Sequence, residues 1–237
     1  MDIRAEVWSP LQNTAVWLGA WLHGLEATDN LVDALADLGS DGLVEVLGDI
    51  RRSVLLDAPS PAVRLILAGP GEAPALPAGG EAARAASRSG QALVLGETHV
   101  LVPDEEGCWE WFVEEEPLPA PAWLSPGEAD ELLTRATNEA ARLVTASGYR
   151  TDALEAPRLT VGTLADFYDT PGLPAAVPPR AAKLFARADR VAAIIETVKT
   201  RMGDHSIDPH LLGLWRHIRA ARMAGVAYAV REFGRLT

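Results

Sequence analysis

The sequence has few of the residues that support disulfide, metal or membrane structure. Its 237 residues include one cysteine, Cys108, so no disulfide forms within the chain and no set of thiolates can bind zinc. The longest apolar run spans residues 15–22, whereas a membrane-spanning helix needs about 20 residues. Asp2 and Glu6 outweigh Arg4 near the start, which does not fit a secretory signal. These absences predict a cytoplasmic protein without a membrane partner.

Familiar catalytic and cofactor motifs are absent as well. No GxGxxG, GxxxxGK[ST], GxSxG or HExxH pattern occurs. His210 and His217 are separated by about 10.5 Å along an expected helix, which is too far for one metal ion. Cys108 has His99 on a nearby expected strand, but we expect a buried, inert thiol. We therefore assign no catalytic residue, no metal site and no cofactor, and lean away from an enzyme.

What remains is the composition of a packed globular protein, with 48% hydrophobic and 23% charged residues. Capping and turn residues divide the first part into three expected helices, and Ser9-Pro10-Leu11-Gln12 begins the first as a capping box. These helices cover residues 9–24, 28–39 and 40–56. Short apolar runs bounded by turn residues then predict four strands, at residues 62–67, 92–95, 98–102 and 108–113.

The second half of the chain is predicted to be mainly helical. Its expected helices cover residues 125–148, 178–202 and 208–233, and the last two pair as an antiparallel hairpin. The fold predicted is α+β: N-terminal helices packed on a small antiparallel sheet, followed by a mainly helical C-terminal region that contains this long hairpin. The corresponding regions are residues 1–120 and 121–237.

Acidic residues recur at every fourth position across the second and third expected helices. Like charges at this spacing repel one another, so this face should lie in water. It is either a solvated surface, which we favour, or a docking surface for a basic partner. The six residues are Asp29, Asp33, Asp37, Asp41, Glu45 and Asp49.

Charge is divided unevenly along the chain. Residues 1–179 hold 10 Lys and Arg against 28 Asp and Glu, whereas residues 180–237 hold 11 against 5. On the first helix of the expected hairpin, four cations fall within about 60° of one another on ideal geometry. We call this face the basic ridge, and it consists of Lys183, Arg187, Arg190 and Arg201. It should stay exposed and is a candidate site for anions.

The final expected helix is apolar around most of its circumference, which is typical of a helix in the middle of a bundle. Arg219 and Arg222 lie among its apolar positions. Because an enclosed guanidinium without a partner is costly, each should meet a carboxylate from residues 1–179. The alternative is an anion-binding pocket, since arginine presents a fork that fits carboxylate and phosphate.

The first expected helix carries Trp17 and Trp21 one turn apart. Core packing is the default interpretation of this pair. The apolar surface is nevertheless large for one small sheet to cover, so we predict a homo-oligomer or a stable protein partner that uses this helix or the adjacent strand edge.

Three functions fit these patterns. We favour a cytoplasmic interaction or scaffolding protein without catalysis. The alternative is a binder of anionic ligands or nucleic acid that uses the basic C-terminal hairpin, through Lys183, Arg187, Arg190, Arg201, Arg219 and Arg222. A compact acidic partner surface or a small anion fits better than nucleic acid, because the strongly acidic residues 1–179, which we call the acidic body, would repel a polyanion. A third hypothesis is that the protein is an enzyme whose active site lies between the two regions.

Overall fold

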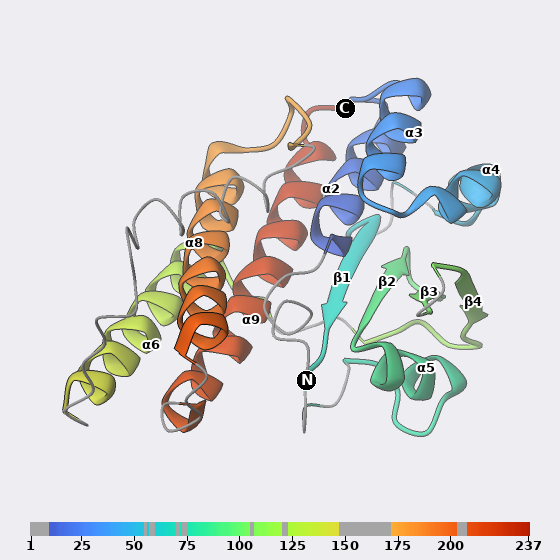
Figure 1. Cartoon of the computed structure of the whole chain (residues 1–237). Coiled ribbons are helices and arrows are strands. Elements are labelled where there is room, and N and C mark those ends of the chain that lie inside the picture. Colours follow the sequence, from blue (N-terminus) through green and yellow to red (C-terminus); the bar gives the residue numbers. More distant parts are fainter. Residues whose placement is uncertain are drawn as a thin grey trace.

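The structure is a computed structural model of the whole chain. It describes residues 10–54, 56, 60–69, 72, 75–104, 107–119, 123–146, 172–202 and 208–237, and at 198–202 and 208–212 only the backbone. Four antiparallel strands form a sheet in the order β1-β2-β3-β4 (Figure 1). Their bounds are Val63–Leu67 for β1, Gln91–Leu95 for β2, His99–Pro103 for β3 and Trp109–Val113 for β4. All four predicted strands are confirmed, each within one or two residues at either end.

One face of this sheet is covered by helices from both ends of the chain. The N-terminal elements are α2 (Leu11–Leu22), α3 (Thr28–Asp37), the 3-10 helix η1 (Asp41–Val46) and α4 (Leu47–Ser53). Leucines from three strands and side chains of α2, η1 and α4 enclose the core on this face, together with the C-terminal part of the last helix. The third predicted helix was wrong in its first half, because the chain enters it as a 3-10 helix.

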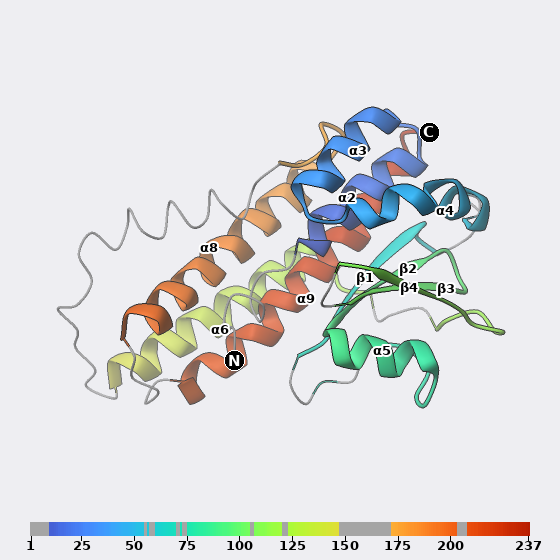
Figure 2. The same cartoon turned by 45° about the vertical axis from the view of Figure 1, so that its right-hand side comes forward.

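The opposite face of the sheet is covered by one short helix, α5 (Glu81–Ser89) (Figure 2). Its buried alanines lie against Ile66 of β1, Val94 of β2 and the two valines of β3. This helix was not predicted from the sequence. Because alanine has so small a side chain, the helix can approach the sheet closely, but it gives only a weak apolar pattern.

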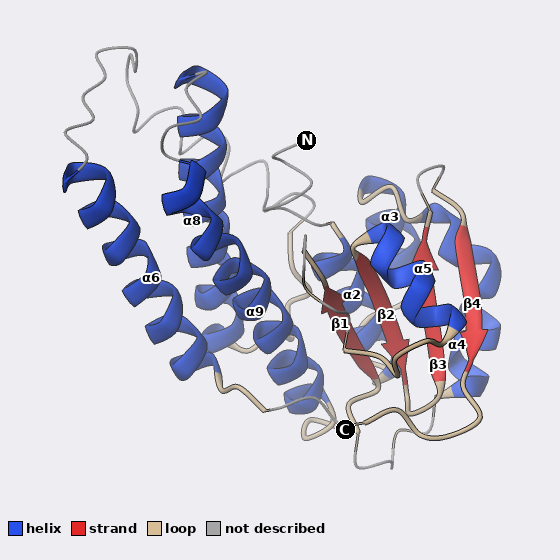
Figure 3. Ribbon diagram, turned by 90° about the horizontal axis from the view of Figure 1, so that it is seen from below, coloured by secondary structure: helices blue, strands red, loops and turns tan. Residues whose placement is uncertain are grey.

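Three long helices form the C-terminal region: α6 (Pro126–Ala146), α8 (Pro179–Met202) and α9 (Asp208–Phe233) (Figure 3). Helix α9 packs on α6 and α8 and also on α2 and β1, as its apolar circumference predicted. The α+β prediction is therefore confirmed. The sequence also predicts a short helix near residues 164–168, and both this segment and the capping residue Ser9 lie outside the described residues.

The acidic face is exposed, as both interpretations of it require. All six of its carboxylate residues are exposed. The tryptophans of α2 instead belong to the core: Trp21 is buried, and the indole N–H of Trp17 donates to the carbonyl oxygen of Gly172 at 3.0 Å. Since α3, α9 and β1 cover α2, the apolar surface that motivated an oligomer is covered within one chain.

Candidate anion-binding groove

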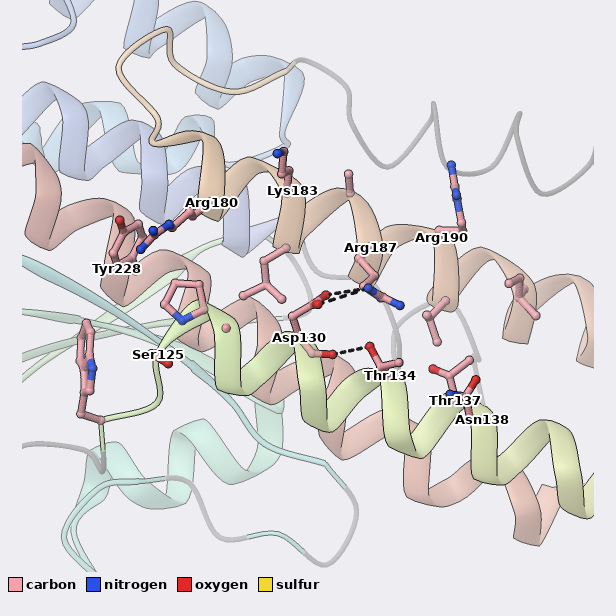
Figure 4. A pocket seen from close by; sticks show the side chains of 17 residues that line it. Ser125, Asp130, Thr134, Thr137, Asn138, Arg180, Lys183, Arg187, Arg190 and Tyr228 are labelled. Carbon is pink, nitrogen blue, oxygen red and sulfur yellow. Dashed lines mark hydrogen bonds and ion pairs between the residues drawn. The ribbon is translucent and has the colours of Figure 1, made fainter.

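A groove of about 880 Å³ lies between α6 and α8 (Figure 4). The two helices run in the same direction along it, because Ser125 lies near Arg180 at one end and Asn138 lies near Arg190 at the other. We call it the α6–α8 groove. Its main lining residues are Trp123, Ser125, Asp130, Thr134, Thr137 and Asn138 on one side, Arg180, Lys183, Leu184, Arg187, Arg190, Val191 and Ile194 from α8, and Tyr228 from α9.

Helix α8 gives the groove an apolar floor and a basic rim. Leu184 and Val191 are buried, whereas four cations of the same helix are exposed, and these are Arg180, Lys183, Arg187 and Arg190. From Arg180 to Arg190 the helix rises by about 15 Å. In Figure 4 the side chain of Arg187 points toward α6, and that of Arg180 toward Tyr228. The side chains of Lys183 and Arg190 extend away from α6 in this view and form the outer part of the rim.

One ion pair spans the groove. Arg187 Nη1 lies 3.0 Å from Asp130 Oδ1 and 3.2 Å from Oδ2, and both side chains are a little less than half exposed. The hydroxyl of Thr134 donates to the backbone carbonyl of Asp130 at 2.6 Å, and the Asp130 carboxylate faces α8. Because water screens such a half-exposed pair, it contributes little to stability and can open for a competing anion.

The first turn of α6 closes one end of the groove. Ser125 and Glu128 form a capping box, in which the Ser125 backbone N–H and hydroxyl both donate to the Glu128 carboxylate, at 3.0 Å and 2.6 Å. These hydrogen bonds lower the pKa of Glu128 below its usual value. At the same end, the guanidinium of Arg231 lies 4.9 Å from the ring centre of Trp123.

The structure brings most of the basic ridge into this groove. Lys183, Arg187 and Arg190 are exposed as predicted, and the side chain of Arg201 lies outside the described residues. The prediction missed Arg180, although it lies three residues before Lys183 on the same face. It also missed the whole α6 wall, because nothing in the sequence indicates which helix packs beside α8.

Arg219 forms an ion pair instead of a ligand site. Its Nη2 lies 2.9 Å from Glu72 Oε2, so the predicted carboxylate from residues 1–179 is confirmed. The guanidinium lies directly against Gly69, where a Cβ atom would come within 2.1 Å of it. Only glycine fits at that position without moving Arg219.

Arg222 is fully buried and joins three helices. Its Nη1 lies 2.6 Å from Asp189 Oδ1 of α8 and 2.7 Å from the side-chain oxygen of Gln12 of α2. The prediction that Arg222 would pair with a carboxylate from residues 1–179 was wrong as far as the described residues show, because its carboxylate partner is Asp189 of α8. Neither Arg219 nor Arg222 lines the groove.

Cys108 and His99, which the sequence places on neighbouring expected strands, have separate environments in the structure. Cys108 is exposed in the β3–β4 turn, where its backbone N–H donates to Asp104 at 2.8 Å, so the expectation of a buried thiol was wrong. His99 Nδ1 accepts a hydrogen bond from the indole N–H of Trp111 at 3.0 Å. Within the described part of the chain, no three His, Cys, Asp or Glu side chains are grouped so as to hold a metal ion.

Comparisons with known proteins match both parts of the chain. Residues 12–123 match the N-terminal domain of the Rv1486c-like proteins, and residues 127–223 match the C-terminal domain. The chain is similar to the Rv1486c-like proteins over both of their domains. The α6–α8 groove lies in the part similar to the C-terminal domain, apart from Trp123, Ser125, Pro126 and Tyr228.

Two relatives from Mycobacterium tuberculosis are each 24% identical to this chain, in alignments that cover 80% of it and 82% of the relative. They are named Uncharacterized protein Rv1486c, from strain ATCC 25618 / H37Rv, and Uncharacterized protein MT1533, from strain CDC 1551 / Oshkosh. No solved structure matches the chain. Among the described residues, no helix is both long enough and apolar enough to cross a membrane.

Proposed function

We propose that this protein binds a small anionic ligand in the α6–α8 groove. The observation that carries the proposal is the charge of the lining: four cations of α8 border the groove, and Asp130 is the one acidic residue among its lining residues. Its volume of about 880 Å³ lies within the range of about 300–1,000 Å³ that is usual for small-molecule sites. Arginine side chains at such a rim bind carboxylate or phosphate through paired N–H groups.

A small anion fits the molecule better than a nucleic acid does. Residues 1–179 carry 28 acidic against 10 basic residues, and the described part of this acidic body packs against α8 and α9. Charges more than about 8 Å apart are largely screened at physiological salt, so a ligand confined to the groove escapes most of this repulsion. A polyanion that extends beyond the groove does not.

The Arg187–Asp130 pair sets how the groove responds to a ligand. An anion that contacts Arg187 competes with the Asp130 carboxylate for the same N–H groups. Replacement by asparagine removes the charge that competes and keeps the size of the side chain. We expect Asp130→Asn to raise anion affinity by up to about fivefold, which corresponds to the upper range for an exposed ion pair.

Isothermal titration with pyrophosphate at low ionic strength tests the proposal. Arg187→Gln should weaken binding by about tenfold or more, because hydrogen bonds from a charged group that points across the groove are lost. Arg135→Gln is the matched control, since Arg135 is exposed on α6, pairs with Glu131 and does not line the groove. Absence of pyrophosphate binding, or an equal loss in the control, would contradict the proposal.

An interaction or scaffolding protein is the second candidate, and one observation favours it. Strand β4 has a neighbouring strand on one side only within the described sheet, and its Val113 is 64% exposed. Such an open edge can pair with a strand of another chain. Light scattering at high micromolar concentration tests for a homo-oligomer, and a monomer there would remove self-association from this candidate.

A further inference from the structure

The α6–α8 groove combines two kinds of surface that a simple inorganic anion does not need. Below the cations, Leu184 and Val191 form an apolar floor, and Ile194 continues it at the end near Asn138. Ile194 is 41% exposed, and at the opposite end Trp123 is 49% exposed. An exposed aliphatic side chain and an exposed indole on one groove are surfaces that gain free energy when an apolar group covers them.

We infer that the ligand is a single-chain amphiphilic anion. Its carboxylate or phosphate head contacts the cations of the rim, and its apolar chain passes over the buried Leu184 and Val191 and covers the exposed side chain of Ile194. This inference rests on the proposed anion-binding function and adds the apolar body of the ligand. From Leu184 to Ile194, ten residues further along α8, the groove extends by about 15 Å, which suits an extended chain more than a compact ring.

The occupant is one molecule and not a membrane surface. The apolar floor is recessed between two helices, so a single chain can reach it while a flat bilayer cannot. The net charge of −12 also opposes approach to an anionic bilayer, whereas the local charge of the groove attracts one anionic head. The groove is therefore complementary in charge to one anionic head, whereas the protein as a whole is not complementary to an anionic membrane.

Chain length provides the decisive measurement. Butyl, hexyl, octyl and dodecyl phosphate, each below its micelle concentration, are titrated into the intact protein. Each added methylene that reaches the floor should tighten binding by about fourfold until the groove is filled. Dodecanol, which has the same chain without the charge, should bind at least tenfold more weakly than dodecyl phosphate.

Two exposed aliphatic residues supply a matched pair of variants. Ile194→Ser should remove much of the gain in affinity that the longer chains bring. Leu132→Ser is the control, because Leu132 is 38% exposed on α6 and does not line the groove. Circular dichroism of both variants checks that they fold, and both positions are exposed enough to accept serine.

The outcomes separate this inference from the function on which it rests. If pyrophosphate binds as tightly as dodecyl phosphate, the inference of an amphiphilic ligand is wrong, and the proposed anion-binding function is still supported. If neither binds, the proposed function fails as well. If dodecanol binds as tightly as dodecyl phosphate, the anionic head is wrong. Co-sedimentation with anionic phospholipid vesicles, without binding of the monomeric phosphates, would assign the groove to a membrane surface and overturn the inference.

Discussion

At the scale of single residues, the β3–β4 pair holds one histidine in a defined protonation state. The ring centres of His99 and Trp111 lie 5.6 Å apart in an edge-to-face arrangement, and the indole N–H donates to His99 Nδ1. Because an indole nitrogen can only donate, this Nδ1 must be unprotonated. Partial burial acts in the same direction and lowers the pKa of His99 below 6.5.

This contact predicts a loss of stability in mild acid. A histidine whose folded pKa lies below its unfolded value stabilises the fold above pH 6.5, and that contribution is lost as the pH falls through the folded pKa. Burial also lowers the pKa values of His23 and His217, so they act in the same direction. The free energy of urea unfolding should therefore be lower at pH 5 than at pH 7.5.

The variant His99→Gln isolates one part of this effect. Glutamine has no titratable group and can still accept from Trp111, so the difference in unfolding free energy between the two pH values should become smaller. The remaining difference in unfolding free energy includes the contributions of His23, His217 and Glu128, whose pKa values are also lowered. A variant that loses as much stability in acid as the wild type would show that His99 does not titrate across this range.

At the scale of elements, the helices and strands that were predicted correctly are those with a strong local pattern of apolar and turn residues. Helix α9 is apolar almost all round and lies centrally as expected, and the four strands stand between clear turn residues. Helix α5 was missed because it is built mainly from alanine and polar residues. The α6 wall of the groove was missed for a different reason: the basic ridge is visible in the sequence, but its neighbouring helix is fixed only by packing around α9.

The contact between α8 and α9 depends on one glycine. A Cβ atom at Gly225 would lie 2.3 Å from Cε1 of Phe185, whose ring is buried. Overpacking of this kind costs about 1–3 kcal/mol, and the better helix propensity of alanine offsets up to about 1 kcal/mol. We expect Gly225→Ala to lower the free energy of unfolding by about 1–2 kcal/mol in urea denaturation.

A second glycine of the same helix provides the control. Nothing lies within 4 Å of a Cβ atom at Gly213, which is exposed. Gly213→Ala should therefore show the propensity effect alone and stabilise the protein by up to about 1 kcal/mol. Equal effects of the two substitutions would mean that the close approach at Phe185 does not constrain the packing of α8 on α9.

At the scale of the whole molecule, one helix belongs to two cores. The C-terminal part of α9 packs on the sheet and α2, through Val226, Ala229, Val230 and Phe233. Its N-terminal part packs between α6 and α8, through Leu214, Trp215, Ile218, Ala221 and Ala224. The buried Arg222 side chain lies between these two groups and joins α9 to both α8 and α2. The two regions therefore share a structural element and not only a surface.

Because α9 contributes to both cores, we predict that the regions 1–120 and 121–237 do not fold independently. A chain of residues 1–120 lacks α9, so one side of α2 and the adjoining part of β1 lose their cover, which includes Phe233 and Val230. Since domain stability is a small difference between large terms, loss of this layer should leave the fragment unfolded. The full chain should unfold in a single transition, with tryptophan fluorescence and far-ultraviolet circular dichroism coincident in urea. A fragment of residues 1–120 with a dispersed amide spectrum and a cooperative transition of its own would establish instead that α9 only docks onto an independent N-terminal domain.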